Sequence, residues 1–313
     1  ADASPRALEA ARAAGVVTAD RCYPSVADAV ADQSIDAVLV TTDGARHAEV
    51  VRTALRAGKH VLVEKPFVPT MAQARELADE AAALDRTLMV SQNYRFFPAA
   101  VAARRLVRDQ ELGQILHVDI DFRKFSPAGL NRHWAHPLLL DMGIHHFDLM
   151  RTVLGREPAT IDCRTWNPPG TGWADPPSAA AIVDFGDGVT VSYRGSWLHP
   201  GPPTAWAGEW VMVFERGTVT WTSRGDRSGP RSAEGDVVTV YRNGAAAEEM
   251  ALPRLGLMDR AGALDAFTRA LATGTPPEST AAENLGSLAL ALGAICSAER
   301  GEPVELTTSA SSR

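Results

Sequence analysis

The chain of 313 residues is long enough for two domains, and its 45% hydrophobic and 22% charged residues are ordinary for a globular protein, which argues against disorder. Its net charge of −7 argues against a general binder of nucleic acid or of anionic membranes, because the phosphate groups of those partners require clustered lysines and arginines. We find no apolar run that approaches the roughly 20 residues needed to span a bilayer, and we therefore expect no membrane contact.

The first third of the chain alternates apolar runs with amphipathic segments. Ser4 followed by Pro5 predicts an N-cap and the first position of a helix, which Gly15 closes. Strands that are apolar throughout and alternate with helices indicate a parallel sheet covered on both faces. The strands are predicted at 35–42, 60–66 and 87–93, and the helices between them at 46–57 and 71–84.

The pattern changes after a helix predicted at 98–108. Residues 113–125 alternate as a half-buried strand does, and further β-rich runs between 158 and 242 are joined by turns rich in glycine, proline and aspartate. This part of the chain should hold a large, mostly antiparallel sheet. Two helices rich in alanine and leucine, at 256–272 and 280–299, are expected to end the fold.

The predicted fold is therefore α/β, with a parallel sheet of the nucleotide-binding type followed by an α+β domain. The change of pattern argues against a TIM barrel, which would keep alternating strands and helices to the end. The boundary between the two domains should fall near residues 93–98, and residues 307–313 are expected to be disordered. Three scattered cysteines without Cys-x-x-Cys spacing, Cys22, Cys163 and Cys296, argue against a zinc ribbon or a disulfide framework and indicate a reducing cytoplasm.

Charged residues follow the second strand of the parallel sheet. Glu64 and Lys65 come directly after its apolar run, and Pro66 stops the strand and forces a turn. Ligands bind at the carboxyl ends of strands in open α/β sheets, so Lys65 is a candidate site residue. The competing interpretation is an ion pair on the surface, and the sequence favours neither.

The preceding strand ends in TTDGARH, residues 41–47. Thr41 and Thr42 offer hydroxyl and amide groups at the same sheet edge, just before a helix N-terminus that favours anions. A plain turn with Asp43 as an N-cap is the simpler interpretation. Asp2 lies where a dinucleotide fold holds the adenine ribose, although by itself it is more simply a capping residue.

The stretch LLLDMGIHHFDLM, residues 138–150, carries two adjacent histidines. Projected on an α-helix, His145 shares one face with Asp141 and Asp148, which lie about a turn away on either side. This arrangement orients an imidazole and stabilises its charged form, as a general base requires. His146 lies on the opposite, apolar stripe and is interpreted as a buried packing residue.

A metal site is the alternative for the same residues. His145, Asp141 and either His133 or His136 could together bind a metal in a hydrolase or lyase, although there is no His-x-x-x-His pair. Several tryptophans of the second half could stack on sugar rings, but packing in strands and loops explains most of them, and none is assigned.

Four motifs, TTDGARH, AGKHVLVEKPFVPT, SQNYRFFP and LLLDMGIHHFDL, occur in this order. Together they resemble the glucose–fructose oxidoreductase/inositol dehydrogenase (Gfo/Idh/MocA) family of nicotinamide-dependent dehydrogenases, over residues 1 to about 300. The resemblance implies a Rossmann-type dinucleotide-binding domain over 1–95. It also implies a substrate-binding and oligomerisation domain over 96–313, whose open sheet forms a homodimer or homotetramer.

The resemblance also implies roles for single residues. Lys65 matches the lysine that holds the substrate hydroxyl beside the nicotinamide, His145 the proton acceptor, and Asp141 the aspartate that binds substrate or assists the histidine. The cofactor-binding residues are expected to be Asp2, Thr41, Thr42, His47, Glu64 and Lys65. If Asp2 contacts the ribose, NAD is favoured over NADP, because a carboxylate repels the 2′-phosphate.

The chain departs from the family pattern in two places. Asp43 stands where the family commonly has proline, and the first strand with its G-x-G-x-x-G turn does not occur in the sequence. Either a preceding segment of roughly thirty residues supplies this βα unit, or the protein lacks it and binds the cofactor weakly.

The sequence therefore predicts a cytoplasmic NAD(P)-dependent oxidoreductase that acts on a secondary alcohol of a sugar, cyclic polyol or related small molecule. A non-catalytic sugar-binding protein of the same fold is the first alternative, and the metal-dependent hydrolase or lyase is a weaker one.

Overall fold

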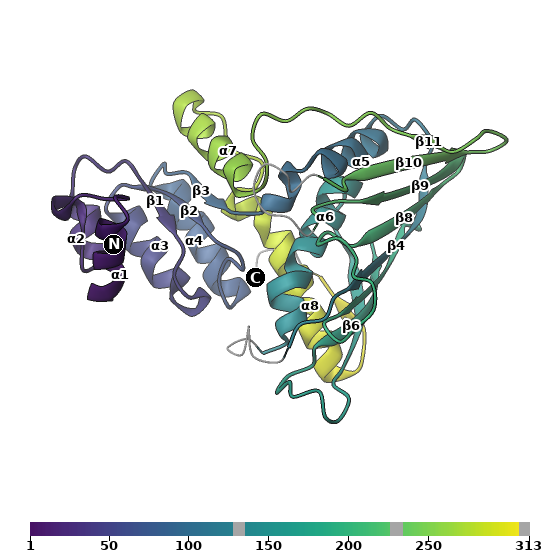
Figure 1. The fold of residues 1–313 in the computed structure, drawn as a ribbon, viewed down its shortest axis with the longest axis horizontal. Coiled ribbons are helices and arrows are strands. Elements are labelled where there is room, and N and C mark those ends of the chain that lie inside the picture. Colours follow the sequence, from purple (N-terminus) through teal and green to yellow (C-terminus); the bar gives the residue numbers. More distant parts are fainter. Residues whose placement is uncertain (128–134, 226–233, 307–313) are drawn as a thin grey trace. The chain divides into compact units, whose positions relative to one another are not determined.

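The computed structural model describes residues 1–127, 135–225 and 234–306, and Figure 1 gives its ribbon with the element labels used below. The chain forms two compact units. Unit 1 comprises Ala1–Ser91 and Ala266–Asn284, and unit 2 comprises Gln92–Asp265 and Leu285–Arg313. The sequence predicted a division at residue 95. The observed units differ from it chiefly because Ala266–Asn284, a segment late in the sequence, belongs to unit 1. The disorder expected at 307–313 concerns residues outside the described ranges.

Unit 1 contains a parallel sheet of the order β1-β2-β3. Val61, Leu62 and Val63 of β2 are buried, as expected for a strand covered on both faces. Leu39 of β1 is 53% exposed, because β1 is the edge strand among the described residues. The elements of this unit are α1 (Pro5–Ala13), η1 (Ala19–Arg21), α2 (Val26–Ala31), β1 (Ala37–Val40), η2 (Gly44–Arg46), α3 (His47–Arg56), β2 (His60–Val63), α4 (Met71–Ala83) and β3 (Leu88–Val90).

The helix boundaries of unit 1 follow from side-chain caps. Ser4 Oγ accepts a hydrogen bond from the amide of Ala7, and Thr70 Oγ1 accepts one from the amide of Gln73. Gly15, just past α1, has φ +68°, a conformation that side chains disfavour. The predicted helices at these positions are thus confirmed, whereas the short helix α2 was not predicted.

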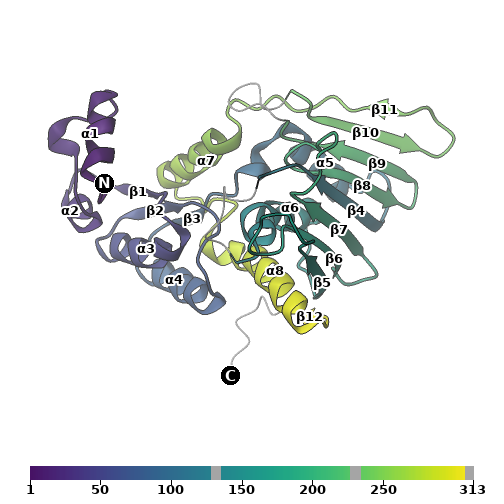
Figure 2. The same ribbon diagram turned by 60° about the horizontal axis from the view of Figure 1, so that its bottom comes forward.

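Unit 2 is built on a nine-stranded sheet, whose strand order among the described residues is β11-β10-β9-β8-β4-β7-β6-β5-β12 (Figure 2). In the part of the chain that the structure describes, β4 and β7 are the one parallel pair of this sheet, which confirms the predicted mostly antiparallel sheet. Its strands are β4 (Ile115–Arg123), β5 (Thr160–Trp166), β6 (Ser178–Asp184), β7 (Thr190–Ser196), β8 (Glu209–Phe214), β9 (Gly217–Thr222), β10 (Val237–Arg242), β11 (Glu248–Glu249) and β12 (Val304–Glu305).

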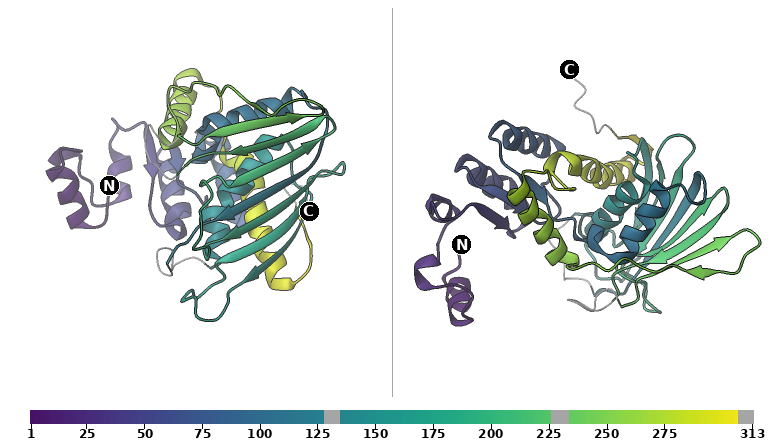
Figure 3. Two further views of the ribbon diagram at one scale, coloured as in Figure 1. Left: turned by 45° about the vertical axis from the view of Figure 1, so that its right-hand side comes forward. Right: turned by 90° about the horizontal axis from the view of Figure 1, so that it is seen from above.

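The helices of unit 2 cover one face of this sheet and leave the other open (Figure 3, left). Side chains therefore alternate along each strand: Val118, Ile120 and Phe122 of β4 are buried, while His117 and Asp119 are exposed. The helical elements are η3 (Asn93–Phe96), α5 (Pro98–Arg108), the π-helix η4 (Leu138–Gly143) and α6 (Ile144–Leu154). Two longer helices, α7 (Asp259–Thr273) and α8 (Ala281–Arg300), each contribute residues to both units.

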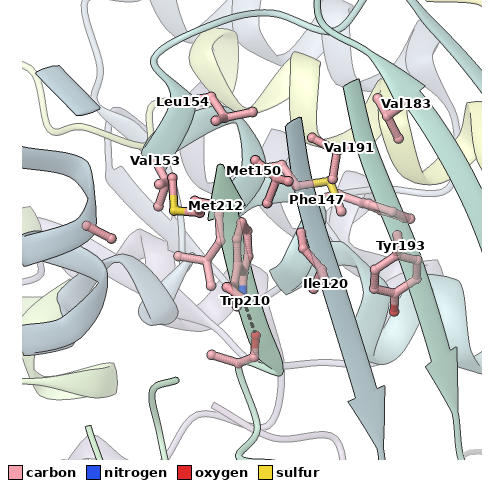
Figure 4. Packing of buried hydrophobic residues seen from close by; sticks show 14 of the residues in the cluster. Ile120, Phe147, Met150, Val153, Leu154, Val183, Val191, Tyr193, Trp210 and Met212 are labelled. Carbon is pink, nitrogen blue, oxygen red and sulfur yellow. Dashed lines mark hydrogen bonds between the residues drawn. The ribbon is translucent and has the colours of Figure 1, made fainter. Parts of the chain in front are cut away.

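The core of unit 2 lies between α6 and the covered face of the sheet. Phe147 and Met150 of α6 pack among Ile120, Val191 and Met212 from three strands (Figure 4). This packing fixes α6 against the sheet, so the position of its first residues is determined by a buried apolar contact.

Helix α8 is more apolar than the sequence analysis recognised. Among the described residues it is the one helix long and apolar enough to cross a membrane, by length and composition alone. Of its most apolar stretch, 61% is buried, and Leu290, Ala291 and Ala294 belong to the core of unit 2. These contacts are those of a core helix.

Candidate active site

The predicted residues of unit 1 lie at the carboxyl edge of its sheet. β1 and β2 end in register at Val40 and Val63, and the amide of Glu64 donates to Val40 O at 2.9 Å, which continues the ladder beyond the strands. Thr41 and Thr42 follow β1, and Lys65 follows Glu64 after β2. The predicted placement of Lys65 at this edge is confirmed, and its chemical role stays a prediction.

The turn after β2 is held by His47. The Lys65–Pro66 peptide is cis. Nδ1 of His47 lies 3.0 Å from both Pro66 O and Phe67 O, and Nε2 lies 3.0 Å from Thr42 O. Carbonyl oxygens only accept hydrogen bonds and an imidazole donates only from a protonated nitrogen, so His47 donates to the backbone from a ring N–H and lies between the loop after β2 and the loop after β1. The contact of His47 with a cofactor stays a prediction.

Two acidic residues of unit 1 act as local caps. Asp43 Oδ1 accepts from the amide of Ala45 at 2.9 Å at the start of η2, which is the simpler of the two interpretations of this turn. Asp2 Oδ1 accepts from the amide of Ser4 at 2.8 Å. The proposed contact of Asp2 with an adenine ribose stays a prediction.

The two adjacent histidines of unit 2 are separated as predicted. The ring of His146 is fully buried, with Nδ1 3.1 Å from Tyr193 Oη and Nε2 2.9 Å from Trp206 O. Burial lowers the pKa of His146 to about 4, so it is neutral at physiological pH. His145 is 6% exposed and points to a different cluster, where its ring stacks on Tyr94.

The helical projection of this stretch requires one correction. Leu138–Gly143 is a π-helix that continues into α6, whereas the sequence analysis assumed a regular α-helix throughout. A Cβ added at Gly143 would lie 3.2 Å from Leu138 O, which is a tight contact. The wide turn therefore favours glycine at this position. Asp141 therefore precedes His145 by a wider turn than predicted. π-Turns of this kind are frequent at functional sites.

Asp148 has a different role from the one predicted. Its two carboxylate oxygens accept from Arg95 Nε and Nη2 at 2.7 and 2.6 Å, and Ser287 Oγ also donates to Oδ1 at 2.7 Å. The side chains of Arg95 and Asp148 are 3% and 1% exposed. Asp148 thus anchors α6 to η3 and α8, rather than serving simply as a carboxylate beside His145.

A series of aromatic and cationic contacts extends from the Tyr94 ring, on which His145 stacks. The guanidinium carbon of Arg224 lies 4.8 Å from the centroid of the Tyr94 ring and 5.5 Å from that of Trp206, and Lys124 Nζ lies 4.5 Å from the Trp206 centroid. Burial raises the pKa of Tyr94, the charge and hydrogen bond of Arg224 oppose this shift, and the charges of Asp259 and Asp141 add to it. Tyr94, Arg224 and Lys124 were not predicted as site residues, because no local pattern marks contacts between residues so far apart in the chain.

A metal centre finds no support among residues 1–127, 135–225 and 234–306. They contain no group of three or more His, Cys, Asp or Glu side chains that could hold a metal ion. His136 Nε2 lies 3.4 Å from Glu299 Oε1. The other candidate, His133, is outside the described residues.

Comparison with known proteins decides the family. Residues 1–92 match the family profile described as "Oxidoreductase family, NAD-binding Rossmann fold", and residues 100–220 match the GFO/IDH/MocA C-terminal domain. The chain belongs to the Gfo/Idh/MocA family. This membership confirms the resemblance seen in the four motifs, as well as the predicted Rossmann-like sheet followed by a larger sheet.

Relatives of this Gfo/Idh/MocA protein include dehydrogenases of sugars and polyols. It is 28% identical to the uncharacterized protein y4oX of Sinorhizobium fredii over 97% of this chain and 86% of that one. It is 32% identical to inositol 2-dehydrogenase of Rhizobium meliloti over 51% of this chain and 48% of the relative. The match to 1,5-anhydro-D-fructose reductase of Ensifer adhaerens is 27% identical over 91% of this chain and 84% of the relative.

Solved structures share the fold. An aldose-aldose oxidoreductase from Caulobacter crescentus, complexed with glycerol, superimposes with a TM-score of 0.84 at 20% identity, covering 97% of this chain and 90% of that one. An oxidoreductase from Agrobacterium radiobacter in complex with NAD+, L-tartaric acid and magnesium gives a TM-score of 0.81 at 21% identity, covering 97% and 89% of the two chains.

The residues present fit the nicotinamide part of the family's cofactor. Gln92 follows Ser91 at the end of β3 and is buried, and neither polar atom of its amide has a hydrogen-bond partner among the described residues. A primary amide offers two donors and an acceptor, which complements the carboxamide of nicotinamide. The printed sequence contains no G-x-G-x-x-G turn for the pyrophosphate.

Proposed function

We propose that this Gfo/Idh/MocA protein is an NAD(P)-dependent oxidoreductase that transfers a hydride between nicotinamide and a secondary alcohol carbon of a sugar, cyclic polyol or related compound. The observation that carries the proposal is the separation of the two adjacent histidines. His146 is neutral and bonded on both ring nitrogens, while His145 stacks on Tyr94, which contacts Arg224, at the start of a helix fixed by the core. The names of the relatives, an inositol dehydrogenase and an anhydrofructose reductase, support the substrate class.

The proposed residues divide the reaction between them. His145 takes the proton of the substrate hydroxyl as general base, and Asp141 binds the substrate or assists His145. Lys65 holds the same hydroxyl oxygen and stabilises the negative charge that develops on it. As the oxygen loses its proton, the carbon–oxygen bond gains a second pair of electrons and the carbinol hydrogen leaves with its own pair. Bound nicotinamide supplies the hydride acceptor, or the donor in the reverse direction.

The cofactor site is proposed at the carboxyl edge of unit 1. Thr41, Thr42 and Glu64 line this edge, and the Gln92 amide is available for the carboxamide. A contact of Asp2 with the ribose would favour NAD over NADP, because the carboxylate repels a 2′-phosphate.

The open face of the unit 2 sheet is proposed to bind a second copy of the chain, in a homodimer or homotetramer. Ile182, Val211 and Tyr241 are exposed on this face, and Ile182 and Val211 lie in one row that crosses Ser192 and Asp119. Exposed apolar side chains gathered on one face mark an interaction surface. The free state of all three cysteines agrees with the proposed cytoplasmic location.

Hydride transfer assays on the full-length protein test the function. Absorbance of NADH is followed with inositols, aldoses and anhydro sugars in the oxidative direction, and with the matching ketones in the reductive direction. His145→Asn and Lys65→Met should each lower kcat by about a hundredfold or more, since general acid–base and charge-stabilising groups contribute this much. His146→Gln, which changes the neighbouring packing residue, is the matched control. Turnover close to wild type in both site variants would refute the assignment.

A further inference from the structure

The ring of Tyr94 lies face to face with the imidazole of His145. The ring centroids are 4.0 Å apart and the planes differ by 5°. Tyr94 belongs to η3 and His145 to α6, so the contact joins two elements that are far apart in the sequence. Both side chains are buried, which leaves the stack little access to water.

Tyr94 is itself held on several sides. Its hydroxyl accepts a hydrogen bond from Arg224 Nη1 at 2.8 Å, and its ring packs edge-on against Phe97 at 6.2 Å. The next residue, Arg95, forms the buried bidentate pair with Asp148 of α6. Element η3 therefore contacts α6 through two consecutive residues, Tyr94 and Arg95. The buried Arg95–Asp148 pair holds in place the two elements that carry the stacked rings.

We infer that Tyr94 is a positioning residue for His145: its ring fixes the plane of the imidazole and stabilises the imidazolium that forms when His145 accepts a proton. The face of an aromatic ring carries negative charge density and attracts a cation. A parallel stack also opposes rotation of the imidazole about its side-chain bonds, which keeps its ring nitrogens in one direction. The inference rests on the proposed function for the identity of the proton donor, the substrate hydroxyl.

The phenol does not compete for the proton. Burial raises the pKa of Tyr94, so the ring stays neutral at physiological pH. Among the described residues, the charged groups near the stack or in contact with its neighbours include three carboxylates and three cations. The carboxylates are Asp141 of η4, Asp148 of α6 and Asp259 at the start of α7, and the cations are Arg95 of η3, Arg224 after β9 and Lys124 after β4. A substitution that removes only the ring leaves all six in the protein, so its effect reports on the ring.

Titration of His145 by NMR tests the inference without any turnover. The full-length protein is labelled at histidine, and the His145 signal is assigned by its loss in His145→Asn. In the wild-type protein its ring protons should be shifted upfield by the Tyr94 ring current. Tyr94→Leu should remove that shift and lower the titration midpoint of His145 by about 0.4 to 1.5 pH units, whereas Tyr94→Phe, which keeps the ring and loses only the hydroxyl, should retain both.

Kinetics give a second measurement. Tyr94→Leu should lower kcat by about ten- to a hundredfold with a smaller change in KM, and should move the acidic limb of the pH profile downward, while Tyr94→Phe stays near wild type. A wild-type His145 without the upfield shift would overturn the inference even if the leucine variant did not fold. An equal loss of kcat in Tyr94→Phe and Tyr94→Leu would also overturn it. The hydrogen bond from Arg224 to the Tyr94 hydroxyl would then be the important contact, and not the ring. A normal NMR result without hydride transfer would instead refute the proposed function.

Discussion

Replacing Arg95 with methionine removes one partner of the buried ion pair that joins η3 to α6. The two hydrogen bonds, of 2.7 and 2.6 Å, join side chains that are 3% and 1% exposed. Methionine matches the unbranched stem of arginine and has no charge, so Asp148 keeps Ser287 as its remaining side-chain donor among the described contacts. Breaking one side of such a pair costs about 3–5 kcal/mol, because the remaining carboxylate is buried without its counter-charge.

The expected loss is large enough to measure by thermal unfolding. For a folding unit of about two hundred residues, each kcal/mol corresponds to about 2–4 °C, so Arg95→Met should lower Tm by roughly 6–20 °C. Circular dichroism and urea unfolding at neutral pH give the measurement. Arg108→Met is the matched control: it breaks the exposed Arg108–Asp109 pair and should cost no more than about 1 kcal/mol.

A double variant separates the loss of the ion pair from the cost of the unpaired carboxylate. Arg95→Met combined with Asp148→Leu removes both charges and should recover most of the lost stability, because apolar replacement of a complete buried pair is often neutral. A single variant as stable as the Arg108→Met control would refute the reasoning, as would a double variant that is no more stable than Arg95→Met.

Two further predictions concern pH and assembly. The pKa of His146 is lowered to about 4 in the folded protein, so the unfolded chain takes up the proton first and stability should fall as pH drops from about 6.5 to 4, by roughly 3 kcal/mol in total. Urea unfolding across this range should show a shallower fall in His146→Gln, and parallel curves for the two proteins would contradict the buried neutral state. Ile182→Glu and Val211→Glu place charges on the open face of the unit 2 sheet and should shift the protein to monomers in light scattering after gel filtration. Val16→Glu, at an exposed position of unit 1, should leave the mass unchanged, and an oligomer that survives both sheet variants would exclude this face as the interface.

Local patterns predicted most of the fold. Caps such as Ser4 and Thr70 are read from neighbouring residues, and the alternation along β4 reflects a sheet with one covered face. The opposite orientations of His145 and His146 also follow from local helical geometry. Helix α2 was missed because its six residues carry too little periodicity for a prediction.

The environment of the site required the tertiary structure. Arg95 and Asp148 are 53 residues apart, and Tyr94 lies 130 residues from Arg224, so neither contact leaves a signal in a sequence window. The π-helix was missed for another reason. The stretch has the composition of an ordinary helix, and the small residue Gly143 is compatible with either form.

The π-helix before α6 behaves as a one-residue insertion into a helix. A wider turn holds more residues than the 3.6 of an α-helix, so the chain before it is rotated relative to the chain after it. Deleting one residue, such as Met142, would let the turn close to a regular α-helix and would change the angle around the helix axis between Asp141 and His145. The direction in which these two groups face each other is thus encoded by residue count as well as by residue type, and a length change of one residue is enough to redirect it.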